Sequence, residues 1–294
     1  MVIATGFFDG VHLGHRLVID TLTDAARKRD TGSVVVTFWP HPRVVLQQGA
    51  RDLRLLSSLD EKRDMLLGLG VDRVEVINFT KEFSALSAEE YIKDWLIGEY
   101  GATSVLLGYD NHLGRDQLSP ERAAQVASDA GLEVLTAPGV SARELKISST
   151  RIRHSLALGQ IELAREMLGY DYCLHGIVVP GNRMGRALGF PTANMQLVDP
   201  LRLVPGRGVY LSAVDVLGRR YMGMTNIGVR PTLTKDTVPV IETHILDFDE
   251  DIYGMDIRVS FQRKIRDEVQ FSSAGELMEQ LGRDKNLCLT LISK

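Results

Sequence analysis

Residues 5–15 read TGFFDGVHLGH, and this stretch decides the fold of the first half of the chain. It follows three apolar residues at positions 2–4. After it, apolar residues recur near the spacing of one helix face, at Leu17, Val18, Leu22, Ala25 and Ala26. The pattern predicts a strand, a tight turn built on glycines and then an amphipathic helix.

The predicted turn has the features of a phosphate-binding site. The free N–H groups and positive dipole end of a starting helix attract anions. Gly10 and Gly14 let a ligand approach the backbone closely. His12 and His15 add hydrogen-bond donors for phosphate oxygens. A single histidine near a turn is more often a surface or packed residue, but His-x-Gly-His after a strand, with Phe-Asp-Gly before it, favours a functional site.

The composition sets limits on size, partners and compartment. A length of 294 residues suggests about two domains. The formal net charge of −4 argues against nucleic acid as the main partner, and no segment approaches the roughly 20 apolar residues of a membrane span. Cys173 and Cys288 lack metal-ligand spacing, and no basic leader precedes an apolar run. We therefore expect a cytoplasmic protein with reduced thiols that acts on small molecules, without structural zinc or a signal peptide.

Strands and helices are predicted to alternate through the first half of the chain. The strands fall at 33–38, 74–79, 104–107 and 132–135, and the helices at 59–69, 88–97 and 120–130. This order predicts a parallel sheet covered on both faces, with ligands bound beyond the carboxyl ends of the strands. Three loops follow strands, so we expect one site to collect all of them: 5–15, 40–42 and 108–114.

Residues 146–153, KISSTRIR, indicate a second phosphate contact. Serine and threonine hydroxyls cap a starting helix, and arginine forks onto phosphate oxygens. An ordinary capped amphipathic helix is the alternative reading of this segment. Helices at 149–158 and 161–168 are predicted to close the first domain.

The pattern changes after residue 169, where strands follow one another without helices between them. The turn signals and spacing predict an antiparallel barrel. A last helix is predicted over 273–291, where Ser273 and Glu276 form a capping-box pattern. The predicted strands are 174–179, 209–216, 221–226, 238–246 and 257–263.

Residues 181–194, GNRMGRALGFPTAN, form a second constellation. The chain has no P-loop motif, but a basic glycine loop covers phosphates with backbone N–H groups. Thr192 and Asn194 offer the neutral oxygens that suit Mg²⁺ bound together with substrate phosphates. A strained loop beside a strand is the alternative for these two residues alone.

Several of these segments resemble one family. Residues 5–15 resemble the nucleotidyltransferase signature, and their longer form is similar to that of bacterial bifunctional riboflavin kinase/FAD synthetases. Residues 147–153, ISSTRIR, match a further motif of that family near the end of its first domain. Riboflavin kinase motifs are matched, in the family's order, at 185–194, 208–210, 225–232, 241–247 and Arg266-x-Glu268. The resemblance covers nearly the whole chain with two independent sets of motifs.

The resemblance implies the architecture and both reactions. It implies a Rossmann-like nucleotidyltransferase domain over 1–169 and an antiparallel β-barrel kinase domain with a C-terminal helix over 170–294. The barrel would phosphorylate riboflavin to FMN with Mg²⁺ and ATP. The first domain would adenylylate FMN to FAD and release pyrophosphate.

The resemblance also implies roles for individual residues. Glu242 would be the kinase base, although a strand glutamate on its own reads as a solvated residue. The groups that stabilise charge on the phosphates during adenylyl transfer would be His12, His15 and Arg151. Thr192 and Asn194 would bind the metal. The residues implied in ATP binding are Gly6, Phe7, Asp9, Gly14, Ser148, Ser149, Thr150, Gly185, Arg186, Gly189 and Pro191.

The implied flavin contacts come from both domains. They are Phe38, Pro40, Asp110, Arg230 and Arg266. A rigid turn with packed aromatics explains residues 38–42 about equally well. In the loop at 108–114, Asn111 and Leu113 stand where the family has aromatic residues.

Two rival functions make different demands on the sequence. A monofunctional nucleotidyltransferase with a ligand-binding barrel has no need of Thr192, Asn194 and Glu242 together. A flavin carrier or sensor explains a flavin pocket but not two separate phosphate sites. Each rival leaves part of the sequence unexplained, so the bifunctional enzyme is favoured over both.

Overall fold

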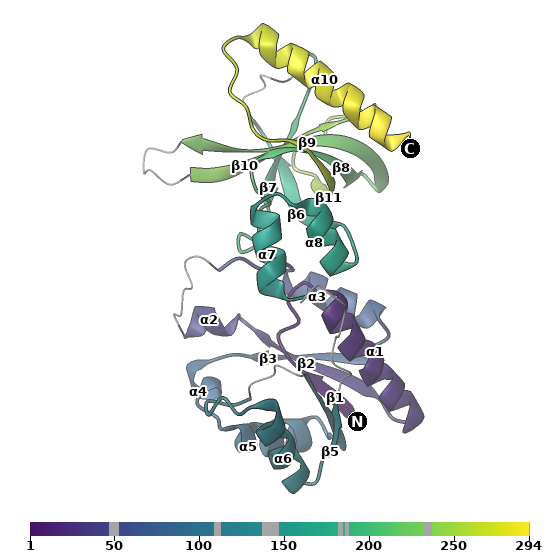
Figure 1. Cartoon of the computed structure of the whole chain (residues 1–294), viewed down its shortest axis with the longest axis vertical. Helices are drawn as coiled ribbons and strands as arrows, with labels where there is room; N and C mark the ends of the chain where they lie inside the picture. Colours follow the sequence, from purple (N-terminus) through teal and green to yellow (C-terminus); the bar gives the residue numbers. More distant parts are fainter. Residues whose placement is uncertain are drawn as a thin grey trace. The chain divides into compact units, whose positions relative to one another are not determined.

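The chain forms two compact units, Met1–Ser149 and Thr150–Lys294. The computed structural model describes residues 1–46, 53–108, 113–136, 147–181, 185, 188–231 and 237–293. Each unit has its own sheet, and each is described below by itself (Figure 1).

The first unit is built on a parallel sheet of five strands in the order β3-β2-β1-β4-β5. β1 lies at its centre, paired with β2 on one side and β4 on the other. The strands are β1 (Val2–Thr5), β2 (Ser33–Trp39), β3 (Arg73–Asn78), β4 (Ser104–Leu107) and β5 (Glu133–Thr136). The helices are α1 (Leu13–Lys28), α2 (Pro42–Val45), α3 (Leu59–Gly68), α4 (Lys81–Ser84), α5 (Ala88–Glu90), the π-helix η2 (Tyr91–Glu99) and α6 (Pro120–Asp129).

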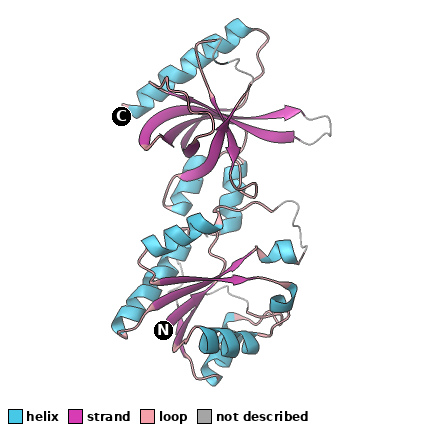
Figure 2. Ribbon diagram, turned by 180° about the vertical axis from the view of Figure 1, so that it is seen from behind, coloured by secondary structure: helices cyan, strands magenta, loops and turns pink. Residues whose placement is uncertain are grey.

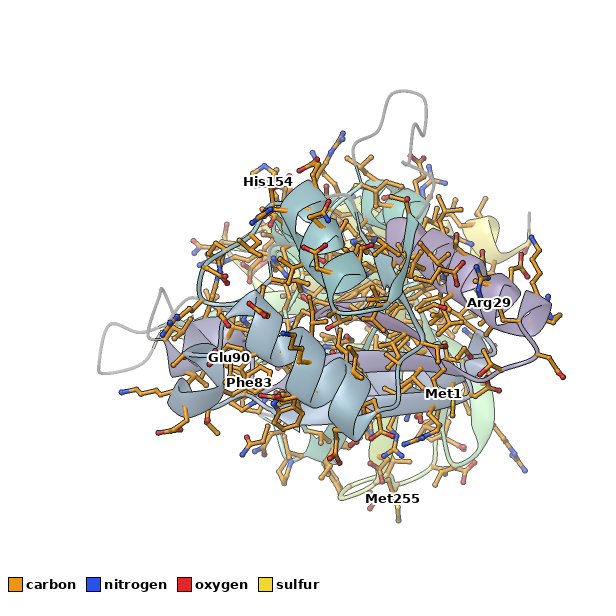
Figure 3. The ribbon with its side chains drawn as sticks, turned by 90° about the horizontal axis from the view of Figure 1, so that it is seen from below. Met1, Arg29, Phe83, Glu90, His154 and Met255 are labelled. Carbon is orange, nitrogen blue, oxygen red and sulfur yellow. The ribbon has the colours of Figure 1, made fainter. Side chains whose placement is uncertain are left out.

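Helices cover both faces of this sheet, because alternate strand residues point to opposite sides (Figure 2). Val2 and Ala4 of β1 pack with α1 and α3 in one core. Ile3 packs with α5, η2 and α6 in the other. The end of α1 is tied to β5 by Arg29, labelled in Figure 3, whose Nε donates to a Glu133 carboxylate oxygen over 2.7 Å. The two cores leave the carboxyl ends of the strands as the place for a site.

The second unit is a closed antiparallel barrel in the order β10-β7-β6-β11-β8-β9. Its helix α8 packs on β6 and β11, and α10 packs on β9 and β11. The strands are β6 (Tyr172–Val179), β7 (Ala193–Leu197), β8 (Gly208–Val216), β9 (Arg219–Pro231), β10 (Thr237–Ile245) and β11 (Asp256–Arg266). The helices are α7 (Ser149–Ala157), α8 (Ile161–Leu168) and α10 (Ala274–Ile292).

The predicted fold class is confirmed, and most predicted elements agree with the structure to within a few residues. The helix predicted over 88–97 is wrong in type, because three residues of α-helix pass into η2. Over two turns, an apolar pattern does not separate a period of 3.6 residues from the wider π spacing. The sequence also missed β7, because the surrounding glycines and Pro191 indicated a loop. The short helices α2 and α4 were missed as well.

Candidate active sites

The turn after β1 has an unusual backbone. Phe8 and Val11 have positive φ angles of 52° and 35°, in a region that residues with a Cβ rarely occupy. Gly10 has φ 76°, which only glycine adopts without strain. A Cβ on Gly14 would lie 3.2 Å from the His12 ring, so any larger residue there would crowd this ring. The turn is therefore strained and depends on its surroundings.

Buried contacts hold this turn in place. Asp9 is 4% exposed, and its Oδ1 accepts hydrogen bonds from the backbone N–H groups of Leu56 at 2.9 Å and Ser57 at 3.2 Å. Gly10 N donates to Ser57 Oγ over 3.1 Å. Ser149 Oγ donates to the Asp9 carbonyl over 3.1 Å. Asp9 thus anchors the turn from behind, and Ser149 joins it from the other end of the unit.

The two histidines of the turn form a stacked pair. His12 caps α1, since its Nδ1 accepts a hydrogen bond from His15 N over 3.3 Å. The rings lie 3.6 Å apart with an interplanar angle of 13°. Burial lowers the pKa of His15 well below its usual value, with smaller contributions from His12 and Lys62. His15 is therefore neutral near pH 7, and its buried Nδ1 has no hydrogen-bond partner among the described residues.

A cavity of about 640 Å³ opens beside this turn. Residues from all three predicted loops line it, including Phe7, Pro42 and Gly114, which confirms that the loops meet. Phe38 lines it as expected, whereas Pro40 is not among the lining residues and Asp110 lies outside the described residues. Its volume and mixed lining suit a drug-sized aromatic ligand.

Aromatic side chains form one side of this cavity. Phe38 lies 5.9 Å from Phe79 and 5.8 Å from Phe83, between ring centroids. Tyr91 Oη and Thr5 Oγ1 share a buried hydrogen bond of 2.6 Å, and burial raises the pKa of Tyr91. Five further lining residues were not predicted as site residues from the sequence: Phe79, Phe83, Tyr91, Arg115 and Gln117. No motif marks them, because they come from loops, from the short helix α4 and from the π-helix η2.

In the barrel, strand register aligns the polar residues of the second constellation. Glu242 of β10 is paired with Asn194 of β7 on one side and with Asn226 of β9 on the other. Directly opposed residues of antiparallel strands project from the same face, with Cβ atoms about 4.5–5.5 Å apart. The next residue, Thr243, is buried in the barrel and bonded to Thr225 over 3.0 Å. Since side chains alternate along a strand, Glu242 and both asparagines lie on the outer face.

Two glycines make room around Asn194, Glu242 and Asn226, which together form a polar row. A Cβ on Gly228 would lie 2.6 Å from Glu268 Oε1 and 3.4 Å from Asn226 Nδ2, so the Glu268 carboxylate reaches this end of the row. A Cβ on Gly181 would collide with the Asn194 amide at 2.2 Å. The row was visible in the sequence only as separate motif residues, since register is not readable from sequence alone.

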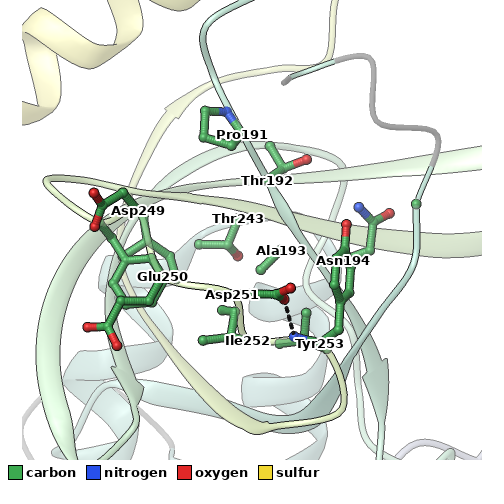
Figure 4. A pocket seen from close by; sticks show the side chains of 14 residues that line it. Pro191, Thr192, Ala193, Asn194, Thr243, Asp249, Glu250, Asp251, Ile252 and Tyr253 are labelled. Atoms are coloured by element: carbon green, nitrogen blue, oxygen red, sulfur yellow. Dashed lines mark hydrogen bonds between the residues drawn. The ribbon is translucent and has the colours of Figure 1, made fainter. Parts of the chain in front are cut away.

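A cavity of about 220 Å³ adjoins Thr192 and Asn194 (Figure 4). Its other side is the turn at 248–253, where Asp251 Oδ1 accepts a hydrogen bond from Tyr253 N over 3.2 Å. No sequence motif marks this acidic segment as part of a site. Hydroxyl, amide and carboxylate oxygens therefore gather around one opening, and this donor chemistry fits Mg²⁺.

The remaining glycine-loop residues lie close to the start of β7. Phe190 N donates to the Gly185 carbonyl over 2.8 Å, and Gly189 has φ 80°. The Pro191 carbonyl bonds to His244 Nδ1 at 2.8 Å. Arg186 lies outside the described residues, as does the side chain of Arg230.

Arg266 joins the end of β11 to α10. Its Nη2 lies 2.8 Å from Asp284 Oδ2, and Asp284 is 3% exposed on α10. Its Nη1 donates to the Asp267 carbonyl over 2.9 Å. This ion pair fixes α10 to the end of β11. Ser148 belongs to the first unit, whereas Thr150 and Arg151 lie on α7 in the second.

The fold and these sites define a class of protein, an ATP-dependent transferase that joins a nucleotidyltransferase-type unit to a kinase-type barrel. A family model described as FAD synthetase matches residues 1–151, and one described as riboflavin kinase matches residues 168–292. The chain belongs to the family of bifunctional riboflavin kinase/FMN adenylyltransferases. It is therefore an enzyme that phosphorylates riboflavin to FMN and adenylylates FMN to FAD.

Curated relatives match over nearly their whole length. The chain is 36% identical over 284 residues to the bifunctional riboflavin kinase/FMN adenylyltransferase of Listeria monocytogenes, covering 97% of this chain and 90% of that protein. It is 34% identical over 294 residues to the Bacillus subtilis protein of the same name, covering 99% and 92%.

A solved structure matches the whole chain as well. It comes from Streptococcus pneumoniae and is described as a macrolide-efflux protein, with a TM-score of 0.90, 32% identity, and coverage of 98% of this chain and 93% of that one. In the present chain, none of the helices within the described residues has the length and apolar character needed to cross a bilayer.

Proposed function

We propose that riboflavin phosphorylation takes place on the outer barrel face that carries Asn194, Glu242 and Asn226. The observation that carries this proposal is the register that sets Glu242 between two asparagines. Glu242 accepts the proton of the 5′-hydroxyl as that oxygen bonds to the γ-phosphorus of ATP, and ADP leaves. A fixed carboxylate on a strand suits a general base. The rest of catalysis is positioning and stabilisation of charge.

The proposed metal ligands are Thr192 and Asn194. Both residues line the smaller cavity, as do Asp249 and Asp251. Bound Mg²⁺ would neutralise phosphate charge there. The protein residues fix the direction from which the phosphates enter.

We further propose that adenylyl transfer takes place at the turn between β1 and α1. An FMN phosphate oxygen bonds to the α-phosphorus of ATP, the bond to the β-phosphate oxygen breaks, and pyrophosphate leaves. Neutral His15, its neighbour His12 and the hydroxyl segment at 148–150, followed by Arg151, stabilise charge on the phosphates. The isoalloxazine ring occupies the aromatic cavity beside Phe38. No protein nucleophile takes part.

The domain division and compartment are also proposals. We place the boundary between the adenylyltransferase and kinase domains at 169/170, close to residue 168, where the riboflavin kinase model begins. The helices α7 and α8 are grouped with the barrel by their contacts within the chain. They therefore form the segment that links the two domains. The free thiols of Cys173 and Cys288 support a cytoplasmic location.

The metal assignment is tested by titrating Mg²⁺ in the kinase assay with Thr192→Ala and Asn194→Ala. Both variants are expected to need more Mg²⁺ for half-maximal FMN formation, because each loses an oxygen ligand. Thr290→Ala, on the exposed side of α10, is the matched control. Unchanged Mg²⁺ dependence in both variants would contradict the assignment.

A further inference from the structure

A buried lysine lies under the strained turn of the first unit. Lys62 of α3 is 2% exposed. Its Nζ donates to the Phe7 carbonyl over 2.9 Å and to Thr37 Oγ1 over 3.0 Å. Thr37 donates to the same carbonyl over 3.2 Å, so two side chains converge on one oxygen. The ammonium also lies 4.1 Å from the centroid of the Phe7 ring.

The groups that contact the Lys62 ammonium are a carbonyl, a hydroxyl and an aromatic ring. Among the described residues, the Lys62 ammonium forms hydrogen bonds and a ring contact but no ion pair with a carboxylate. Burial lowers the pKa of Lys62 to about 8, and Asp9 acts in the opposite direction. Keeping an unpaired ammonium in the interior is costly, and such groups cluster at functional sites.

The effect of the lysine reaches both parts of the proposed adenylyl site. The carbonyl that it holds immediately precedes Phe8, where the chain enters positive φ. Phe7 itself lines the aromatic cavity. Its ring also contacts the His41 ring, with 4.1 Å between the two ring centroids. The charge of Lys62 also contributes to the lowered pKa of His15. Lys62 therefore connects the turn, the flavin wall and the stacked histidines.

We propose that Lys62 is a positioning residue for adenylyl transfer, which holds the turn at residues 6–11 in its phosphate-binding conformation and supplies a fixed positive charge behind it. It acts through Phe7 and does not touch the substrates. The inference rests on the proposed placement of adenylyl transfer at this turn. The neighbouring titratable groups are Asp9, His12 and His15 of the turn and His41 across the Phe7 ring.

The test compares Lys62→Met and Lys62→Arg in the full chain, with FMN and ATP as substrates. Lys62→Met removes the charge at similar size, and kcat for FAD formation is expected to fall about 10- to 100-fold, as for other groups that orient a site from behind. Lys62→Arg is expected to recover much of this loss. Riboflavin phosphorylation by the same preparations is the internal control, and Lys28→Met, at the exposed end of α1, is the matched control.

The pH profile separates this role from simple packing. In the wild type, FAD formation is expected to decline as pH rises through about 8, where the ammonium loses its proton. Lys62→Arg keeps its charge and is expected to remain active at higher pH. A purely structural lysine would lower the melting temperature and leave the shape of the profile unchanged.

Three results would overturn the proposal, and they distinguish a wrong role for Lys62 from a wrong placement of the adenylyl site. Normal FAD turnover in Lys62→Met, with His15→Ala impaired, overturns the role of Lys62 alone. Normal turnover in His15→Ala instead shows that the turn is not the adenylyl site. If Lys62→Met does not fold, coincident pH profiles of the wild type and Lys62→Arg overturn the proposal.

Discussion

The turn of the first unit and the outer face of the barrel, which are the two proposed phosphate sites, are built in opposite ways. At the turn, non-glycine residues adopt positive φ, and the side chains of Ser57 and Lys62 hold its backbone from behind. On the barrel, strand pairing alone aligns Asn194, Glu242 and Asn226, and no unusual backbone is needed. The first site is a strained loop with supports, and the second is a regular ladder with functional side chains.

This difference teaches where each activity is vulnerable. In the proposed adenylyl site, activity would depend on residues such as Asp9 and Lys62, which support the turn from behind. In the proposed kinase site, activity would depend on the side chains of Asn194, Glu242 and Asn226 and on the strand pairing that aligns them. Substitutions that separate the two activities therefore test the comparison itself.

The largest effect is expected for Glu242→Gln. This substitution keeps size and hydrogen bonding but removes the proton acceptor, so riboflavin phosphorylation should fall on the order of 10²–10⁴-fold. Riboflavin affinity should change little, because a base acts on the barrier rather than on ground-state binding. Kinase turnover and flavin affinity are measured on the same preparation.

Glu279→Gln, on the exposed side of α10, is the control for Glu242→Gln. Near-normal turnover would make Glu242 a structural strand residue. Turnover lost together with riboflavin affinity would make it a binding residue instead.

The next largest effect is expected at the histidine pair. His12→Ala and His15→Ala should each slow FAD formation from FMN on the order of 10²–10³-fold, because each removes a donor near developing charge. FMN formation from riboflavin should continue. The comparison fails if a variant with an unchanged melting temperature loses both activities equally. His175→Ala, on β6 of the barrel, serves as the control.

A fragment comparison tests how far the kinase unit is self-contained. Residues 150–294 keep α8, whose Ile161, Ala164, Met167 and Leu168 are buried. A fragment of residues 171–294 exposes the barrel surface that α8 covers on β6 and β11. Both fragments are expected to phosphorylate riboflavin, since each retains a whole barrel, but the longer one should melt at a higher temperature. A soluble, folded longer fragment without kinase activity would contradict an independent site.

The smallest effect concerns the pH dependence of stability. The pKa of His15 is lowered in the folded state, so between that value and about 6.5 the unfolded chain binds more protons. Stability of the first unit should therefore fall as pH drops below about 6.5, by at most about 1.4 kcal/mol per pH unit. His15→Gln should flatten this part of the curve in denaturant titrations between pH 5 and 7. A variant curve parallel to that of the wild type would show that His15 does not titrate in this way.

The layered architecture could be predicted from the sequence, because the spacing of apolar residues and the turn signals are local properties. The run at 2–4, the glycines at 10 and 14 and the alternating elements predict the parallel sheet and its phosphate turn. Capping chemistry also reads well, since Ser273 accepts a hydrogen bond from Glu276 N, although the Glu276 carboxylate accepts from Ser272 N rather than Ser273 N.

The parts that could not be predicted depend on contacts between distant segments. The support of Asp9 by Leu56 and the burial of Lys62 join residues about fifty positions apart, and no local pattern marks them. Arg266 matched a flavin-side motif, but its partner Asp284 lies on a helix whose docking only the structure reveals. Register likewise placed Asn226 beside Glu242, a relation that sequence spacing does not encode.

The central claim is that two separate sites act in succession, and a mixing experiment tests it most directly. Glu242→Gln and His15→Ala are combined with riboflavin, Mg²⁺ and ATP, and FMN and FAD are resolved by chromatography. Each variant alone should form FAD from riboflavin very slowly, whereas the mixture should form it readily, because FMN made by His15→Ala is used by Glu242→Gln. A mixture that forms no more FAD than the sum of the separate variants, although FMN accumulates, would contradict the account.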